Sequence, residues 1–145
     1  MHAALIAEPA PGVRVPTRPE ERPIDTPAIL IVEDEPMTAM LVQRAVAARG
    51  YAVVGPYACD ESALGALSAG GVTAALLDVS LKDGATSAPV AAALSEAGVP
   101  FAFVTGYGPE TGAVASAFPD RLVIPKPVDV ETVGMILDEL VGGGS

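Results

Sequence analysis

The fold of the chain is decided by residues 73–84, which read TAALLDVSLKDG. The first five of these residues form a nearly apolar run, which predicts a strand that is buried on both faces of a sheet. The run ends in one carboxylate, Asp78, and polar loop residues follow it. In an open parallel α/β sheet, ligands bind outside the carboxyl ends of the strands. Asp78 is therefore a candidate functional carboxylate at the tip of a buried strand.

Three other predicted strands also end in groups that bind ions or phosphates. They are 28–32, followed by Glu33, Asp34 and Glu35; 101–104, followed by Thr105; and 121–124, followed by Pro125, Lys126 and Pro127. Carboxylates, a hydroxyl and an ammonium at one sheet edge suit a metal-assisted phosphoryl transfer to an aspartate, which needs positioning and neutralised oxygens. Mg²⁺ prefers oxygen ligands. Neighbouring strands are about 4.8 Å apart, so Glu33, Asp34 and Asp78 can share one ion if the first and third strands are adjacent.

Five strand-then-helix repeats fill the middle of the chain. The expected second strand covers 52–55, and the expected helices are 36–49, 60–69, 87–97, 109–117 and 129–141. Pro36 suits a first helical turn and Gly50 a left-handed stop, while Asp60 and Asp129 are candidate N-caps. The alternation predicts an α/β fold with βαβ units, right-handed crossovers and a doubly wound (βα)5 parallel sheet.

The length of 145 residues suits one domain with a real core. Residues 1–27 hold six prolines and no apolar periodicity, so we interpret them as a disordered or extended leader. The folded domain is expected over 28–141, and the glycine-rich residues 142–145 are expected to be a flexible tail.

The net charge of the chain limits the classes of partner that it can bind. The formal net charge is −10, and the leader contributes −1 from three arginines and four acidic residues. The remaining −9 argues against a nucleic-acid partner, whose phosphates require a basic face. No stretch suits a transmembrane helix, and the single cysteine, Cys59, excludes an intrachain disulfide and fits a reducing cytoplasm. We expect a cytoplasmic protein, monomeric, with no membrane partner.

Residues 28–141 resemble a response-regulator receiver domain. The resemblance depends on five elements in order: ILIVEDEP at 29–36, LLD at 76–78, Asp83-Gly84, VTG at 104–106, and Lys126-Pro127. Residues 100–108, PFAFVTGYG, further resemble the motif of the FAT GUY subfamily, with Val104 in place of its alanine. Receivers of that subfamily are mostly stand-alone proteins of alphaproteobacteria. The family's flavodoxin-like fold has the strand order 2-1-3-4-5.

The resemblance also implies roles for individual residues. Asp78 corresponds to the phosphoacceptor, and Lys126 to the lysine that contacts the phosphoryl group, next to a cis peptide bond at Pro127. Glu33, Asp34 and Asp78 correspond to the Mg²⁺ ligands, together with the backbone carbonyl of Ser80.

The same comparison assigns the conformational switch. Thr105 corresponds to the switch hydroxyl, and Gly106 and Tyr107 follow it in the switch segment. Most receivers carry an aromatic residue three positions before the lysine, where this chain has Val123. Tyr107 is therefore a candidate for the missing aromatic.

The resemblance implies a phosphoacceptor switch, not an enzyme, that assists its own Mg²⁺-dependent phosphorylation and dephosphorylation. The expected phosphodonor is a sensor histidine kinase, for which the HWE type is a candidate, or a phosphotransfer protein. The expected output is a contact with a downstream protein or a phosphorelay. One alternative is a pseudo-receiver that binds partners without being phosphorylated. Another is a phosphatase of the haloacid dehalogenase type, which needs a second aspartate where this chain has Ser80.

Overall fold

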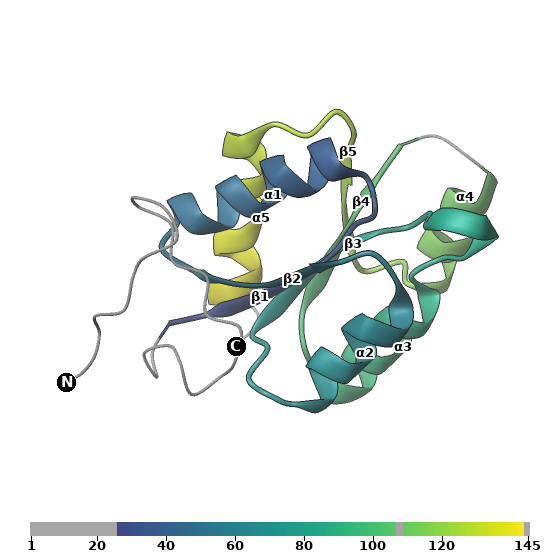
Figure 1. Cartoon of the computed structure of the whole chain (residues 1–145), viewed down its shortest axis with the longest axis horizontal. Coiled ribbons are helices and arrows are strands. Elements are labelled where there is room, and N and C mark those ends of the chain that lie inside the picture. Colours follow the sequence, from purple (N-terminus) through teal and green to yellow (C-terminus); the bar gives the residue numbers. More distant parts are fainter. Residues whose placement is uncertain (1–25, 107–108, 144–145) are drawn as a thin grey trace.

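The computed structural model of the chain describes residues 26–106 and 109–143, which form one sheet with helices on both faces (Figure 1). In chain order the elements are β1 (Ala28–Val32), α1 (Pro36–Ala48), β2 (Ala52–Tyr57), α2 (Asp60–Ser68), β3 (Ala74–Asp78), the 3-10 turn η3 (Lys82–Gly84), α3 (Ala88–Ala97), β4 (Phe101–Thr105), α4 (Pro109–Ala117), β5 (Leu122–Pro125) and α5 (Val130–Gly143).

The five strands are all parallel and follow the order β2-β1-β3-β4-β5. This arrangement confirms the predicted doubly wound fold and its strand order. The three central strands, β1, β3 and β4, are buried along their whole length, as their continuous apolar sequences predict. The first and third strands are neighbours, with Val32 opposite Leu77. The residues that follow them therefore emerge side by side at the carboxyl edge.

Two hydrophobic cores lie on opposite faces of the sheet. On one face, α1 and α5 pack on side chains such as Ile29, Ile31 and Leu76. On the other face, α2, α3 and α4 cover Leu77, Phe103 and their neighbours. The alternation of side chains along each strand sends successive residues to opposite layers. Apolar side chains therefore fill the central strands except at the carboxyl ends of β3 and β4, where Asp78 and Thr105 stand.

Strand β2 is longer than its sequence pattern predicts. The expected strand ends at residue 55, but β2 continues through Gly55 and Pro56 to Tyr57. An edge strand tolerates proline because one side of its backbone has no ladder partner. Gly55 has a φ of 109°, and a Cβ there would lie 2.8 Å from the Ile31 carbonyl oxygen, so glycine is required. The extension allows the Glu33 amide to donate to the Tyr57 carbonyl at 2.9 Å.

Helix boundaries follow the predicted signals with two corrections. Asp129 caps α5 as predicted, because its Oδ2 accepts from the Thr132 amide at 3.0 Å. Asp60 is not the N-cap of α2: Cys59 is still extended and takes that place, so Asp60 lies in the first turn. Helix α5 runs to Gly143, past the expected end at 141. Glycine lowers helix propensity by only about 1 kcal/mol, so it does not force a stop. Among the described residues, no helix is long and apolar enough to cross a membrane.

Candidate functional site

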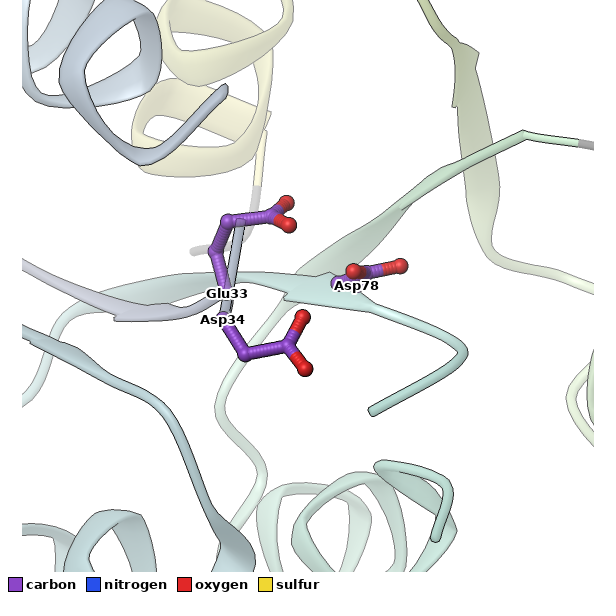
Figure 2. A group of neighbouring side chains, drawn as sticks. All are labelled: Glu33, Asp34 and Asp78. Carbon is purple, nitrogen blue, oxygen red and sulfur yellow. The ribbon is translucent and has the colours of Figure 1, made fainter. Parts of the chain in front are cut away.

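Three carboxylates meet where β1 and β3 end at the same edge of the sheet (Figure 2). Glu33, Asp34 and Asp78 each place one carboxylate oxygen within 4.8 Å of the others. We call these three residues the carboxylate cluster. Glu33 and Asp78 are each only 4% exposed, whereas Asp34 is half-buried. The adjacency of β1 and β3, on which the predicted shared site depends, is confirmed.

Backbone amides orient two members of the cluster. The Glu35 amide donates to Glu33 Oε2 at 3.2 Å, and the Ser80 amide donates to Asp78 Oδ1 at 3.3 Å. Each bond joins a carboxylate to the amide two residues further on, a local turn that acidic side chains favour. The second oxygen of Asp78 faces the other charged groups of the site.

Lys126, which is distant from the cluster in the sequence, places its ammonium beside two of the three carboxylates. Its Nζ donates to Glu33 Oε2 at 3.2 Å and to Asp78 Oδ2 at 3.2 Å, and it lies 3.5 Å from Glu35 Oε1. Its own amide donates to the Thr105 carbonyl at 2.9 Å, just beyond β5. The Lys126–Pro127 peptide bond is cis, as the resemblance implies. The β4–β5 pairing thus positions the ammonium over the two buried acids.

In the described part of the chain, the carboxylates of the site stand close together and face a single ammonium, that of Lys126. Burial, together with the hydrogen bond and negative charge of Asp78, raises the pKa of Glu33 from 4.5 to about 8, against the opposing effect of Lys126. Burial lowers the pKa of Lys126, but the charges of Glu33 and Asp78 outweigh it and raise that pKa overall. One ammonium therefore stays charged and does not fully compensate the clustered acids.

Thr105 ends β4 beside the phosphoacceptor candidate. Asp78 lies opposite Val104, so Thr105 stands one residue further toward the carboxyl edge. The Thr105 side chain is buried, and its Oγ1 donates to the Gly106 carbonyl at 3.3 Å. Gly106 is half-buried. Tyr107, the candidate substitute for the switch aromatic, lies outside the described residues.

Val123 and Leu122 before it are both exposed on β5. Val123 is 47% exposed on the edge strand β5, whereas Ile124 beside it is buried. The side chain at this position is an exposed valine and not an aromatic ring.

The contact between Thr38 and Glu35 is not predicted by the sequence analysis. Thr38 Oγ1 donates to Glu35 Oε1 at 2.6 Å, and the same oxygen faces Lys126. The hydrogen bond and the charge of Lys126 lower the pKa of Glu35. The sequence signal is an acid at the start of a helix with a hydroxyl three residues later, the reverse of the capping-box order, in which the hydroxyl comes first.

The donor set of the cluster fits a hard divalent cation. Its three carboxylates are the oxygen ligands that Mg²⁺ prefers, and two of them are buried where their mutual repulsion favours a counter-ion. Mg²⁺ is thus compatible with the residues present, as the sequence predicts.

Comparison with solved structures identifies the class of protein. The chain is 40% identical to SdrG from Sphingomonas melonis Fr1, with a TM-score of 0.70, and the match covers 80% of this chain and 97% of that one. It is 39% identical to SdrG from Pseudomonas melonis Fr1 in a BeF3-activated conformation, with a TM-score of 0.65 and coverage of 79% and 95%. A signal receiver domain of a modulated diguanylate cyclase from Desulfovibrio desulfuricans G20 is 25% identical, with a TM-score of 0.73 and coverage of 83% and 97%.

The chain therefore belongs to the response-regulator receiver-domain family. Among the solved structures named above, SdrG shares the most sequence with it. No protein-family model matches the sequence, and no curated protein matches it either.

Proposed function

We propose that the chain accepts a phosphoryl group on Asp78 from a histidine kinase or a phosphotransfer protein in two-component signalling. The observation that carries the proposal is the placement of the Asp78 carboxylate: it is buried at a strand tip, 3.2 Å from Lys126 Nζ and beside two further acids. In the transfer, a bond from an Asp78 oxygen to phosphorus forms as the phosphorus–nitrogen bond of the phosphohistidine breaks. The output is a protein contact or an onward phosphorelay.

The surrounding residues take complementary roles. Lys126 binds the oxygens of the transferred group, and the Thr105 hydroxyl donates to one of them, since both groups stand next to Asp78 at the same edge. The carboxylate cluster, with the backbone carbonyl of Ser80, would hold Mg²⁺. When bound, the ion neutralises charge on the phosphoryl oxygens and so assists both phosphorylation and dephosphorylation.

Two exposed methionines lie on the helix that follows this site. Met37 and Met40 on the first turns of α1 are 64% and 53% exposed, and α1 starts directly after the carboxylate cluster. Exposed methionines are adaptable contact groups. They suit a phosphodonor protein, for which a kinase of the HWE type in the cytoplasm is the candidate that the FAT GUY resemblance suggests.

The alternative is a pseudo-receiver that binds partners and is never phosphorylated. Two observations favour the phosphoacceptor instead. The acids and the lysine lie within contact distance of one another, and SdrG has a BeF3-activated conformation.

Radiolabel transfer tests the proposal directly. The chain is incubated with Mg²⁺ and either radiolabelled acetyl phosphate or a histidine kinase that carries a radiolabelled phosphoryl group. The variant Asp78→Asn is compared with the matched variant Asp83→Asn in the exposed loop. We expect stable label on the unsubstituted chain and on Asp83→Asn, and none on Asp78→Asn. Equal labelling of Asp78→Asn would contradict the assignment, and failure of every donor to label the unsubstituted chain would favour the pseudo-receiver.

A further inference from the structure

Among the residues that the structure describes, Lys126 has three carboxylate neighbours, and one of them differs from the other two. Glu33 and Asp78 are buried members of the carboxylate cluster, whereas the Glu35 side chain is 56% exposed and stands outside it. An ammonium has three N–H donors, so all three contacts can be made by one Lys126 side chain. Glu35 is therefore an extra counter-ion at the margin of the site.

The ammonium and a divalent ion compete for the same two carboxylates. Lys126 lies 3.2 Å from Glu33 Oε2 and 3.2 Å from Asp78 Oδ2, and both residues belong to the cluster that suits Mg²⁺. Two cations on shared ligands repel each other. Lys126 must therefore give up part of these contacts when the ion enters, and it needs another negative group within reach.

Glu35 is the group that meets this requirement. Its Oε1 lies 3.5 Å from Lys126 Nζ, so a small movement of the ammonium completes the contact. The carboxylate is held in place by Thr38, whose Oγ1 donates to the same oxygen at 2.6 Å. Thr38 is buried on α1, so its hydroxyl is a fixed anchor for an otherwise exposed side chain.

We propose that Glu35, anchored by Thr38, is the positioning residue onto which the Lys126 ammonium shifts when a divalent cation occupies the carboxylate cluster. This inference rests on the proposed function for its biological meaning, because it concerns the lysine that would bind the phosphoryl group. Glu35 keeps Lys126 beside Asp78 while freeing the oxygens that the ion requires. The contact is partly exposed, so the expected effect on Mg²⁺ affinity is modest, about two- to fivefold.

The chain offers a direct probe of this lysine. Its sequence contains only two lysines, Lys82 and Lys126, so the side-chain ammonium signals of nitrogen-15-labelled protein can be assigned with one Lys82→Arg variant. Lys82 lies in an exposed loop and serves as the internal reference. Titration with MgCl₂ then reports the Lys126 environment and the dissociation constant together, without any phosphoryl donor.

Four variants separate the anchoring role from net charge and from folding. Thr38→Val removes the hydroxyl at constant shape and charge, Thr38→Ser restores it, Glu35→Gln removes the carboxylate, and Glu96→Gln makes the same charge change on α3. We expect Thr38→Val and Glu35→Gln to move the Lys126 signal and to weaken Mg²⁺ binding about two- to fivefold. Thr38→Ser and Glu96→Gln should behave like the unsubstituted chain.

An unchanged Lys126 signal in both Thr38→Val and Glu35→Gln would overturn the proposal, as would equal weakening by Glu35→Gln and Glu96→Gln. Because Glu35 is exposed, its variant remains informative if Thr38→Val does not fold. A chain that shows the expected lysine shifts but takes no label from any phosphodonor would contradict the proposed function alone. The proposed function and the positioning role of Glu35 can therefore be contradicted independently of each other.

Discussion

A single ammonium, that of Lys126, partly offsets the negative charge at the strand tips. Lys126 contacts two buried carboxylates that stand 93 and 48 residues away in the sequence. Its charge stabilises the cluster when no other cation is bound, but it also repels an incoming ion. Opposite consequences for folding and for ion binding follow from this one residue.

Replacing Lys126 should separate these two effects. Lys126→Gln keeps most of the side-chain length and removes the charge, so we expect a lower melting temperature without Mg²⁺ and about tenfold tighter Mg²⁺ binding, or about 1.4 kcal/mol. Lys82→Gln makes the same charge change in the exposed loop and should alter neither the melting temperature nor the Mg²⁺ affinity. Thermal melts measure the first and calorimetric titration the second. Weaker Mg²⁺ binding by Lys126→Gln would contradict the idea that Lys126 and Mg²⁺ compete for the cluster.

The pKa of Glu33 predicts how stability depends on pH. Glu33 has a pKa of about 8 in the folded chain against 4.5 as its ordinary value, because of burial and Asp78. Between these values the folded state binds a proton that the unfolded state has released, so its contribution to stability is lost as the pH rises through this window. Glu33→Gln should lack this contribution.

The melting temperatures of the unsubstituted chain and of Glu33→Gln can be measured between pH 5 and 8 without divalent ions. We expect the melting temperature of the unsubstituted chain to fall more steeply with pH than that of Glu33→Gln. Saturating Mg²⁺ should flatten the curve, because the ion stabilises the ionised carboxylate. Parallel curves for the two proteins would show that Glu33 ionises normally.

At the scale of elements, the carboxyl end of β4 and the start of α4 form the segment best placed to move. Thr105 stands beside Asp78, Gly106 follows it, and the exposed Val123 on β5 supplies no ring to follow the threonine. Glycine makes the backbone after Thr105 permissive. A two-state rearrangement biased by the phosphoryl group is therefore expected here, not in a buried ring of β5.

Beryllofluoride with Mg²⁺ is the phosphoryl mimic that tests this expectation. We predict that backbone NMR shifts change most over 106–117, and that Tyr107→Ala reduces the difference in partner affinity between the two states. Resonances of α2 and α3 away from the site serve as the reference. Large shifts there, with 106–117 unperturbed, would rule out this switch segment.

For the whole molecule, ion binding and folding are linked, because the carboxylate cluster is assembled only when β1 and β3 pair. Mg²⁺ at ten times its dissociation constant should stabilise the fold by about 1.4 kcal/mol, which raises the melting temperature by a few degrees. Asp34→Ala should weaken ion binding and shrink the rise. Calcium-free and magnesium-free buffer provides the baseline, and an equal rise in Asp34→Ala would exclude Asp34 from the ion site.

Local sequence patterns were sufficient for most of the architecture. The apolar runs at 28–32 and 73–77 predict buried strands, and Gly50, Gly98 and Asp129 mark helix ends that the structure contains. These signals succeed because burial and capping act over a few neighbouring residues. They fail at β2, where the Gly55–Pro56 pair looks like a strand end but lies on an edge strand.

The sequence by itself determined which groups stand at the strand tips: Asp78, the acids after β1, Thr105 and Lys126. Only the tertiary structure decided how they meet, because the contacts of Lys126 and the exposure of Val123 depend on strand order and register, which no local pattern encodes. The contact of Glu35 with Lys126 belongs to this second kind, because 91 residues separate the two. The hydrogen bond between Thr38 and Glu35 is local, since it joins residues three positions apart. Periodicity reports whether a residue is buried, but electrostatic partners are chosen through space once the sheet has formed.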